Sequence, residues 1–137
     1  MDSLFTLLYE MVGKKEFQEG LVDLLYVTAK NKEEAYGNPF VKIPNSVTSI
    51  RFGAFSNCSS ITSVNIPNSV NYIDLFAFTK CISLTFINIP NSLKNIDEYA
   101  FVECSNIKNI QIPIKFKPIM KKIFAGVDLS KVKITYT

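Results

Sequence analysis

The chain contains 137 residues, of which 47% are hydrophobic and 20% are charged, and its formal net charge is +3. This composition is typical of one folded domain and excludes a disordered or a fibrous protein. No apolar run approaches the ~18 residues that a membrane-spanning helix needs, so we expect no membrane partner.

The start of the chain bears on where the protein resides. Met1 is followed by Asp2 rather than by the basic segment that opens a secretory signal peptide. We therefore expect a cytoplasmic protein, or a surface or secreted one if a signal peptide was removed before this sequence begins.

Residues 1–38 are expected to be helical. Apolar residues recur at helical intervals up to Val12 and again from Phe17 to Thr28. Asn31 and Glu34 have the spacing of a capping box before a last helical turn. We predict a helical N-terminal cap over the hydrophobic end of the segment that follows. The alternative is a helical unit with a partner of its own.

The segment Ile-Pro-Asn-Ser then begins at Ile43, Ile66 and Ile89, at intervals of 23 residues. A fixed period in this range is typical of a stacked repeat architecture. Val64 and Ile66 alternate with polar neighbours, as in a strand that buries one face. The Pro-Asn-Ser that follows predicts a turn. A second short extended piece, Val70 to Ile73, is expected to run back on the opposite side of the coil.

One coil alone cannot enclose a core, because its few inward side chains would still face water above and below. We therefore predict a β-rich repeat solenoid over residues 39–137, α+β overall once the cap is included. Repeats begin at residues 43, 66 and 89, and an atypical C-terminal repeat begins at residue 112. The parallel ladder is expected to contain about five strands, ~4.8 Å apart: Phe40–Ile43, Ile61–Ile66, Leu84–Ile89, Ile107–Ile112 and Leu129–Tyr136.

The last repeat departs from the others. Ile112 and Pro113 open it, but the Asn-Ser turn is missing, and Pro118 to Phe124 is expected to form a short helix. Phe124 keeps the place of the repeated phenylalanine. The segment LSKVKI from Leu129 repeats the pattern ITSVNI of the second strand, and this alignment predicts the register of the fifth strand.

The cysteines follow the same period. Cys58, Cys81 and Cys104 are 23 residues apart, so each fills the same place in successive coils. A free cysteine is a small hydrophobe that is readily buried. We predict a column of buried thiols and no metal site, because the spacing differs from that of a zinc knuckle and the chain has no histidine.

The joint pattern LxxLxIPxxVxxIxxxAFxxC resembles the BspA-like leucine-rich repeat family, strongly from Phe40 to about Gln111 and weakly beyond. Arg51, Asp74 and Asp97 replace a glycine that is frequent in that family. The resemblance implies a leucine-rich-repeat solenoid. It also implies a protein that takes part in adhesion or in cell contact and is generally found at the surface or secreted.

Several kinds of catalytic site are excluded. Without histidine the chain has no Ser-His or Cys-His pair, and neither common glycine-rich phosphate loop is present. Asp74 and Asp97 share one column, where they imitate a carboxylate dyad, but a periodic column indicates a solvated surface ladder instead. We predict that the protein is not an enzyme and uses no cofactor.

The candidate binding residues are those that alternate outward along the strands, because outward residues of a solenoid vary without disturbing the core. Two columns are expected, the first made of Phe40, Ser63, Phe86, Asn109 and Lys131, the second of Lys42, Asn65, Asn88, Gln111 and Lys133. Exposed aromatic residues ringed by polar groups are typical of protein interfaces. The alternative is that the cap covers Phe40 and that Phe86 has no role.

These columns favour a protein-protein interaction module, as a monomer or a homodimer. One alternative is an inhibitor that docks on an enzyme and blocks it, for example a mobile-element protein acting on a host defence nuclease. Another is a fragment of an adhesion-type surface protein. Direct nucleic-acid binding is the least favoured. Residues 105–137 carry seven lysines against one acid, but these lysines gather at one end rather than along a groove.

Overall fold

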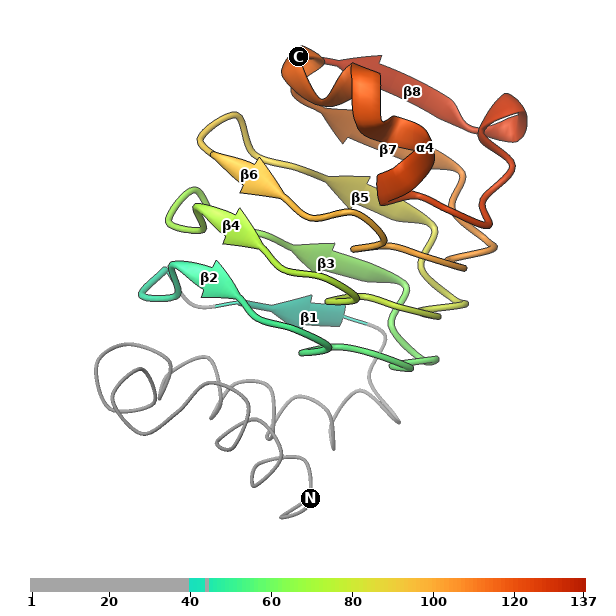
Figure 1. Ribbon diagram of the computed structural model, residues 1–137. Coiled ribbons are helices and arrows are strands. Elements are labelled where there is room, and N and C mark those ends of the chain that lie inside the picture. Colours follow the sequence, from blue (N-terminus) through green and yellow to red (C-terminus); the bar gives the residue numbers. More distant parts are fainter. Residues whose placement is uncertain (1–39, 44) are drawn as a thin grey trace.

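The computed structural model describes residues 40–43 and 45–137, and the predicted helical cap at residues 1–38 lies outside the described residues. In the described part the chain winds into coils that stack on one another (Figure 1). Each of the first three coils has one strand on either side of the stack, so two parallel sheets face each other across the core (Figure 1).

The larger sheet has the strand order β1-β3-β5-β7-β8, and all its strands are parallel. The first four strands lie inside the predicted ranges but are shorter. Parallel pairing of successive repeats is confirmed. The strands are β1 (Phe40–Lys42), β3 (Ser63–Asn65), β5 (Phe86–Asn88), β7 (Asn109–Ile112) and β8 (Lys133–Tyr136).

The smaller sheet has the order β2-β4-β6 and consists of two-residue strands, β2 (Ser49–Ile50), β4 (Tyr72–Ile73) and β6 (Asn95–Ile96). The second of these falls in the extended piece predicted for residues 70–73. In the second and third coils, a tight turn joins the long strand to its short partner. Val70 N donates to Pro67 O at 3.1 Å, and the next coil repeats this bond from Leu93 N to Pro90 O at 3.1 Å. Proline has no N–H for the ladder, so the long strand ends where the turn begins.

The core is built from columns of identical or similar side chains. Four phenylalanines, Phe55, Phe78, Phe101 and Phe124, stack with ring centroids 5.2, 4.9 and 5.3 Å apart. All four are buried, and Phe124 holds the predicted place. Stacked aromatic pairs contribute ~0.5–1.5 kcal/mol beyond the burial of their area. This ladder therefore ties each coil to the next.

The predicted column of buried thiols is confirmed. Cys58, Cys81 and Cys104 are free and buried. Each of the later two thiols donates to a carbonyl one coil below, Cys81 Sγ to Phe55 O at 3.2 Å and Cys104 Sγ to Phe78 O at 3.0 Å.

The last coil replaces the turn and short strand with helical segments. A 3-10 helix, η2 (Ile114–Ile119), contains Pro118 and leads into a short α-helix, α4 (Met120–Ile123). A helical stretch is therefore present where one was predicted, but it begins at Ile114 rather than at Pro118 and ends at Ile123 rather than at Phe124. Another 3-10 helix, η3 (Leu129–Lys131), precedes β8.

The predicted start and register of the fifth strand were wrong. Asp128 Oδ1 accepts hydrogen bonds from Ser130 N at 3.2 Å and Ser130 Oγ at 2.6 Å, and these bonds fold η3. The strand therefore begins at Lys133 rather than at Leu129. The pairing is shifted by two residues, so that Lys133 lies beside Asn109. A two-residue shift preserves which side chains point inward, because strands alternate with a period of two.

Candidate protein-binding face

The outward face of the larger sheet carries two columns of side chains, set by the strand register. The first column is Phe40, Ser63, Phe86, Asn109 and Lys133, and the second is Lys42, Asn65, Asn88, Gln111 and Thr135. Phe40 and Lys42 are assigned to the columns from the backbone pairing of β1 with β3. Val64, Ile87 and Ile110 lie between the columns and are buried, which fixes the backbone under the face.

Two places differ from the prediction, both in the last coil. Lys131 lies in η3 and is not part of either column, while Lys133 belongs to the first column rather than to the second. Thr135, which the sequence did not predict as an outward residue, takes the vacated position beside Gln111. The cause is the hydrogen bonding of Asp128 described above.

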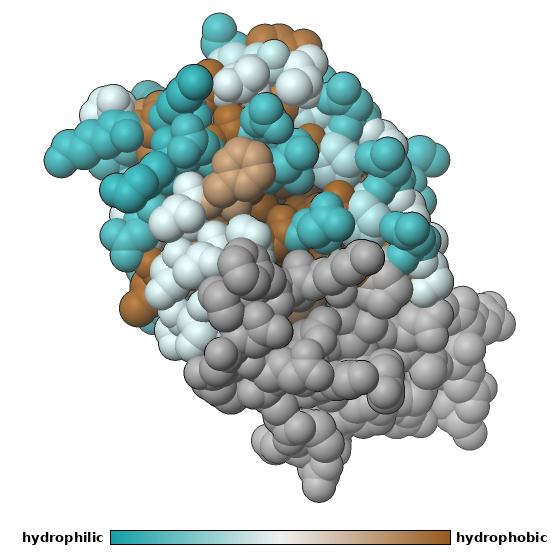
Figure 2. Space-filling model, turned by 180° about the vertical axis from the view of Figure 1, so that it is seen from behind, coloured by the Kyte–Doolittle hydropathy of each residue, from teal (hydrophilic) through white to brown (hydrophobic). Residues whose placement is uncertain are grey.

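Phe86 is the prominent apolar side chain of this face. It is 39% exposed, and the described side chains paired around it on β3 and β7 are polar and uncharged, whereas Lys133 lies at the C-terminal end of its column. Asn65, Asn88 and Asn109 are exposed, whereas Ser63 and Gln111 are half-buried. Seen from behind, the described surface shows hydrophilic and intermediate colours around limited hydrophobic areas (Figure 2). Among the side chains that the structure describes on this face, Phe86 is thus an aromatic group with a polar surround.

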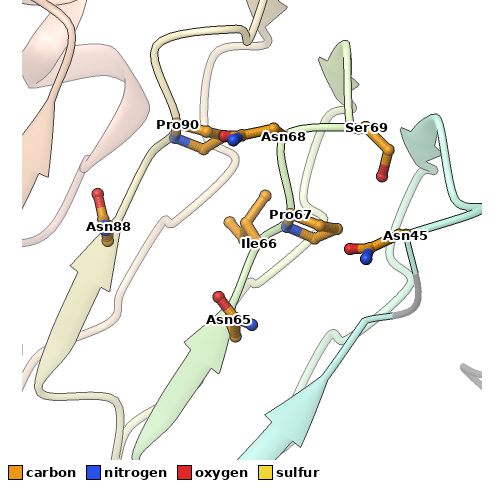
Figure 3. Close-up of a pocket in the computed structure, with 8 residues that line it drawn as sticks. All are labelled: Asn45, Asn65, Ile66, Pro67, Asn68, Ser69, Asn88 and Pro90. Carbon is orange, nitrogen blue, oxygen red and sulfur yellow. The ribbon is translucent and has the colours of Figure 1, made fainter.

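An open depression, here called the amide cleft, lies where the long strands end. It has a volume of about 460 Å³. Figure 3 shows Asn65 and Asn88 at the ends of their strands, and Asn45 and Asn68 on the turns that follow. The lining residues are Asn45, Asn65, Ile66, Pro67, Asn68, Ser69, Asn88 and Pro90. Asparagines recur in the sequence both at strand ends and in turns, but only the geometry of the coil shows that the two sets lie in one depression.

Several lysines of the C-terminal coil form contacts within the protein. Lys115 Nζ donates to Leu93 O at 2.6 Å, and Lys117 Nζ lies 5.4 Å from the ring centroid of Tyr136. Two further lysines form exposed ion pairs, at 3.2 Å for Lys122–Glu98 and 3.9 Å for Lys131–Asp128. The basic excess of this end is therefore partly used in holding the last coil together.

The carboxylates of Asp74 and Asp97 were expected to be solvated, but both residues are half-buried. Tyr72 Oη donates to Asp97 Oδ2 at 2.5 Å, and Asp74 Oδ1 accepts from Leu75 N at 2.7 Å. Burial, followed by the hydrogen bond and negative charge of Asp97, raises the pKa of Asp74. Burial and the bond to Asp97 likewise raise the pKa of Tyr72. The pair thus has a structural role on the side of the smaller sheet.

Asp74→Asn is expected to raise the melting temperature at pH 7 by about 2 °C. This is the size expected for an electrostatic interaction of a half-exposed group that solvent screens. Because the folded-state pKa is raised, the aspartate contributes stability below its ordinary pKa of 3.8 and loses it as the pH rises through the folded value. Asparagine keeps the oxygen that accepts from Leu75 N and carries no charge. Melting curves at several pH values test this. A gain that persists well below pH 3.8, or a loss at pH 7, would contradict it.

No set of three or more histidine, cysteine or acidic side chains suited to a metal ion occurs in the described part of the chain. Within the same residues, no helix has the length and apolar character required to cross a bilayer.

A sequence model of the BspA type leucine-rich repeat region matches residues 37–137 in six copies. The chain belongs to the BspA-type leucine-rich repeat family. Leucine-rich repeat proteins generally mediate protein-protein interaction or adhesion and are typically non-enzymatic binding modules. The expected family membership is therefore confirmed.

Solved structures of this repeat type resemble the chain. The T. pallidum leucine-rich repeat protein TpLRR is 26% identical, with a TM-score of 0.58 over 69% of this chain and 44% of that protein. A leucine-rich repeat protein from Bacteroides ovatus is 20% identical, with a TM-score of 0.56 over 74% of this chain and 30% of that one, and it supports the fold alone. The BspA-type chain thus spans less than half the length of either relative. A comparison with curated protein sequences finds no significant match.

Proposed function

We propose that this chain is a non-enzymatic protein-binding module and that its partner docks on the outward face of the larger sheet. The observation that carries the proposal is the exposure of Phe86 among uncharged polar side chains on a rigid sheet. Buried aromatic anchors surrounded by a polar rim dominate the energy of protein interfaces. Asn65, Asn88, Asn109 and Gln111 form that rim, and Lys133 marks its C-terminal end.

The rigidity of the face favours binding. The outward residues of β3, β5 and β7 are fixed by buried neighbours on the same strand and by parallel pairing with the strands on either side. A partner therefore loses little affinity to ordering this surface, because side-chain and loop ordering are part of the cost of association.

Nucleic-acid binding is less well supported. Binding to a phosphate backbone requires several free cations along a groove, whereas the lysine at the end of the first column stands among neutral amides. Lys115 and Lys117 are directed to a carbonyl and a ring of the protein itself. An inhibitor of an enzyme and an adhesion-type protein are both compatible with a protein partner, and the identity of that partner separates them.

Phe86→Asp is expected to weaken binding of the partner at least ~30-fold, the loss of a hot-spot residue worth ~2 kcal/mol. The partner is first captured from the source cell and purified, and its affinity is then measured by calorimetry. The melting temperature of the variant should stay within ~2 °C of the parent, because surface substitutions are usually close to neutral.

Phe52→Asp provides the matched control. Phe52 is also 39% exposed, but it lies outside the larger sheet and contacts Phe76, with ring centroids 5.7 Å apart. An equal loss of affinity in both variants, or full affinity in Phe86→Asp, would show that the partner binds elsewhere. Affinity that falls steeply with salt would instead favour binding through the lysines.

A further inference from the structure

The amide cleft has a regular chemical composition because it spans consecutive coils. Asn65 and Asn88 are paired in the parallel register, which places their backbones ~4.8 Å apart. Asn45 and Asn68 hold equivalent places in the turns of their coils. The cleft therefore presents two short rows of side-chain amides, one from the strand ends and one from the turns (Figure 3).

These amides are available to a ligand. Ser92 Oγ donates to the backbone oxygen of Asn68 at 2.9 Å, but in the described part of the chain no hydrogen bond engages the side-chain amides of Asn65, Asn68 or Asn88. Ser69 Oγ, on the wall of the cleft, is buried and has no hydrogen-bond partner among the described residues. Buried polar groups in native proteins normally have a partner, from the protein or from ordered water.

The lining restricts the class of ligand. No charged side chain lines the cleft, so it offers no counter-charge to a phosphate or a carboxylate. Its few apolar groups do not form the enclosed apolar wall that binds a hydrophobic small molecule. A side-chain amide both donates and accepts hydrogen bonds, as does a sugar hydroxyl. Rows of amides are therefore complementary to a neutral, polyhydroxylated ligand.

Phe86 adds an apolar platform next to these amides. It lies two residues before Asn88 on the same face of β5, at ~6.6 Å along the strand. The C–H face of a pyranose ring packs against an aromatic face, whose electron density is negative. The spacing of the strands is also close to the length of one pyranose unit, so successive sugars can meet equivalent amides on successive coils.

We propose that the amide cleft, together with Phe86, binds a neutral oligosaccharide that runs across the coils. The open shape of the cleft suits a chain of sugars better than a single enclosed one. A peptide segment is the competing occupant, but it would bring side chains for which the cleft has no apolar pockets. This inference goes beyond the proposed binding of a protein partner and does not depend on it.

The test is a titration of the full chain with cellohexaose, xylohexaose, maltohexaose and N-acetylchitohexaose, followed by NMR. At least one of them is expected to bind with a Kd of about 0.1–1 mM and to shift the side-chain amide signals of Asn65 and Asn88. Affinity should be the same at about 50 and 500 mM NaCl, since neither the ligand nor the cleft is charged. The double variant Asn65→Ala/Asn88→Ala should weaken binding at least tenfold.

Asn71→Ala is the matched control, because Asn71 is exposed and does not line the cleft. It should leave the affinity unchanged, and the melting temperatures of all variants confirm that they are folded. The proposal is overturned if none of the four sugars binds at about 10 mM, where a millimolar site is nearly saturated. It is also overturned if the double variant binds as the parent does, or if only unglycosylated peptides from a display library occupy the cleft. A protein partner that is lost with Phe86→Asp, in a chain that binds no sugar, would leave the protein-binding proposal standing and overturn this one.

Discussion

Phe78→Asp is expected to unfold the chain. Phe78 is fully buried and stacks between Phe55 and Phe101, at centroid distances of 5.2 and 4.9 Å. Loss of a buried phenylalanine alone costs ~3–5 kcal/mol, and an unpaired carboxylate in its place adds several more. Domains of this kind are stable by only ~5–15 kcal/mol, so the sum removes most or all of that margin.

The measurement is far-ultraviolet circular dichroism with thermal melting. The variant should lack both the strand signal of the parent and its cooperative transition. Phe86→Asp makes the same chemical change on the outward face, so its cooperative transition should be retained. If the two variants melted alike, the assignment of inward and outward residues along the strands would be wrong.

The columns of the solenoid could be predicted from the sequence because one period controls all of them. With repeats 23 residues apart, a residue that is buried in one coil has counterparts that are buried in the next. Val64, Ile87 and Ile110 illustrate this, as do the three cysteines. The same reasoning placed Phe86 and Asn88 on the outward face, where the structure has them exposed.

The register of the last strand could not be predicted from the repeat pattern. Aligning LSKVKI with ITSVNI placed Val132 opposite the inward residue of the other strands, whereas Ile134 holds that position. The deciding interaction is local, since Asp128 bonds to Ser130 and folds a short helix that the other coils lack. An aspartate before Leu-Ser favours such a turn. The repeat pattern predicts a strand for the same residues, and the prediction followed the repeat pattern.

The amide cleft could not be predicted from the sequence for a different reason. Asn65 and Asn88 were recognised as outward strand residues, while Asn45 and Asn68 were assigned only to turns. The cleft exists because the turns bend so that both sets line one depression (Figure 3). A periodic pattern shows which residues share a column but not how far one column lies from another. The number of lysines likewise does not indicate which of them bond within the protein.

The three thiols are expected to react at least ~10³-fold more slowly in the native protein than in the unfolded chain. A domain of ordinary stability is unfolded for less than about one part in 10³ of the time, and buried thiols react mainly in that state. Cys58 is 2% exposed, and Cys81 and Cys104 are 0% exposed. The adjacent Cys104 thiol and burial raise the pKa of the Cys81 thiol, and only the thiolate is a strong nucleophile.

Labelling with Ellman's reagent measures this protection. The native chain should react only through rare opening, and all three cysteines of the chain should react promptly in denaturant. Since the thiols share one column across three coils, opening of the stack exposes them together, and the three rates should be similar. One thiol that reacted rapidly in native buffer would show that its coil opens independently of the others. Phe78→Asp should abolish the protection of all three, because the phenylalanine and cysteine columns belong to the same core.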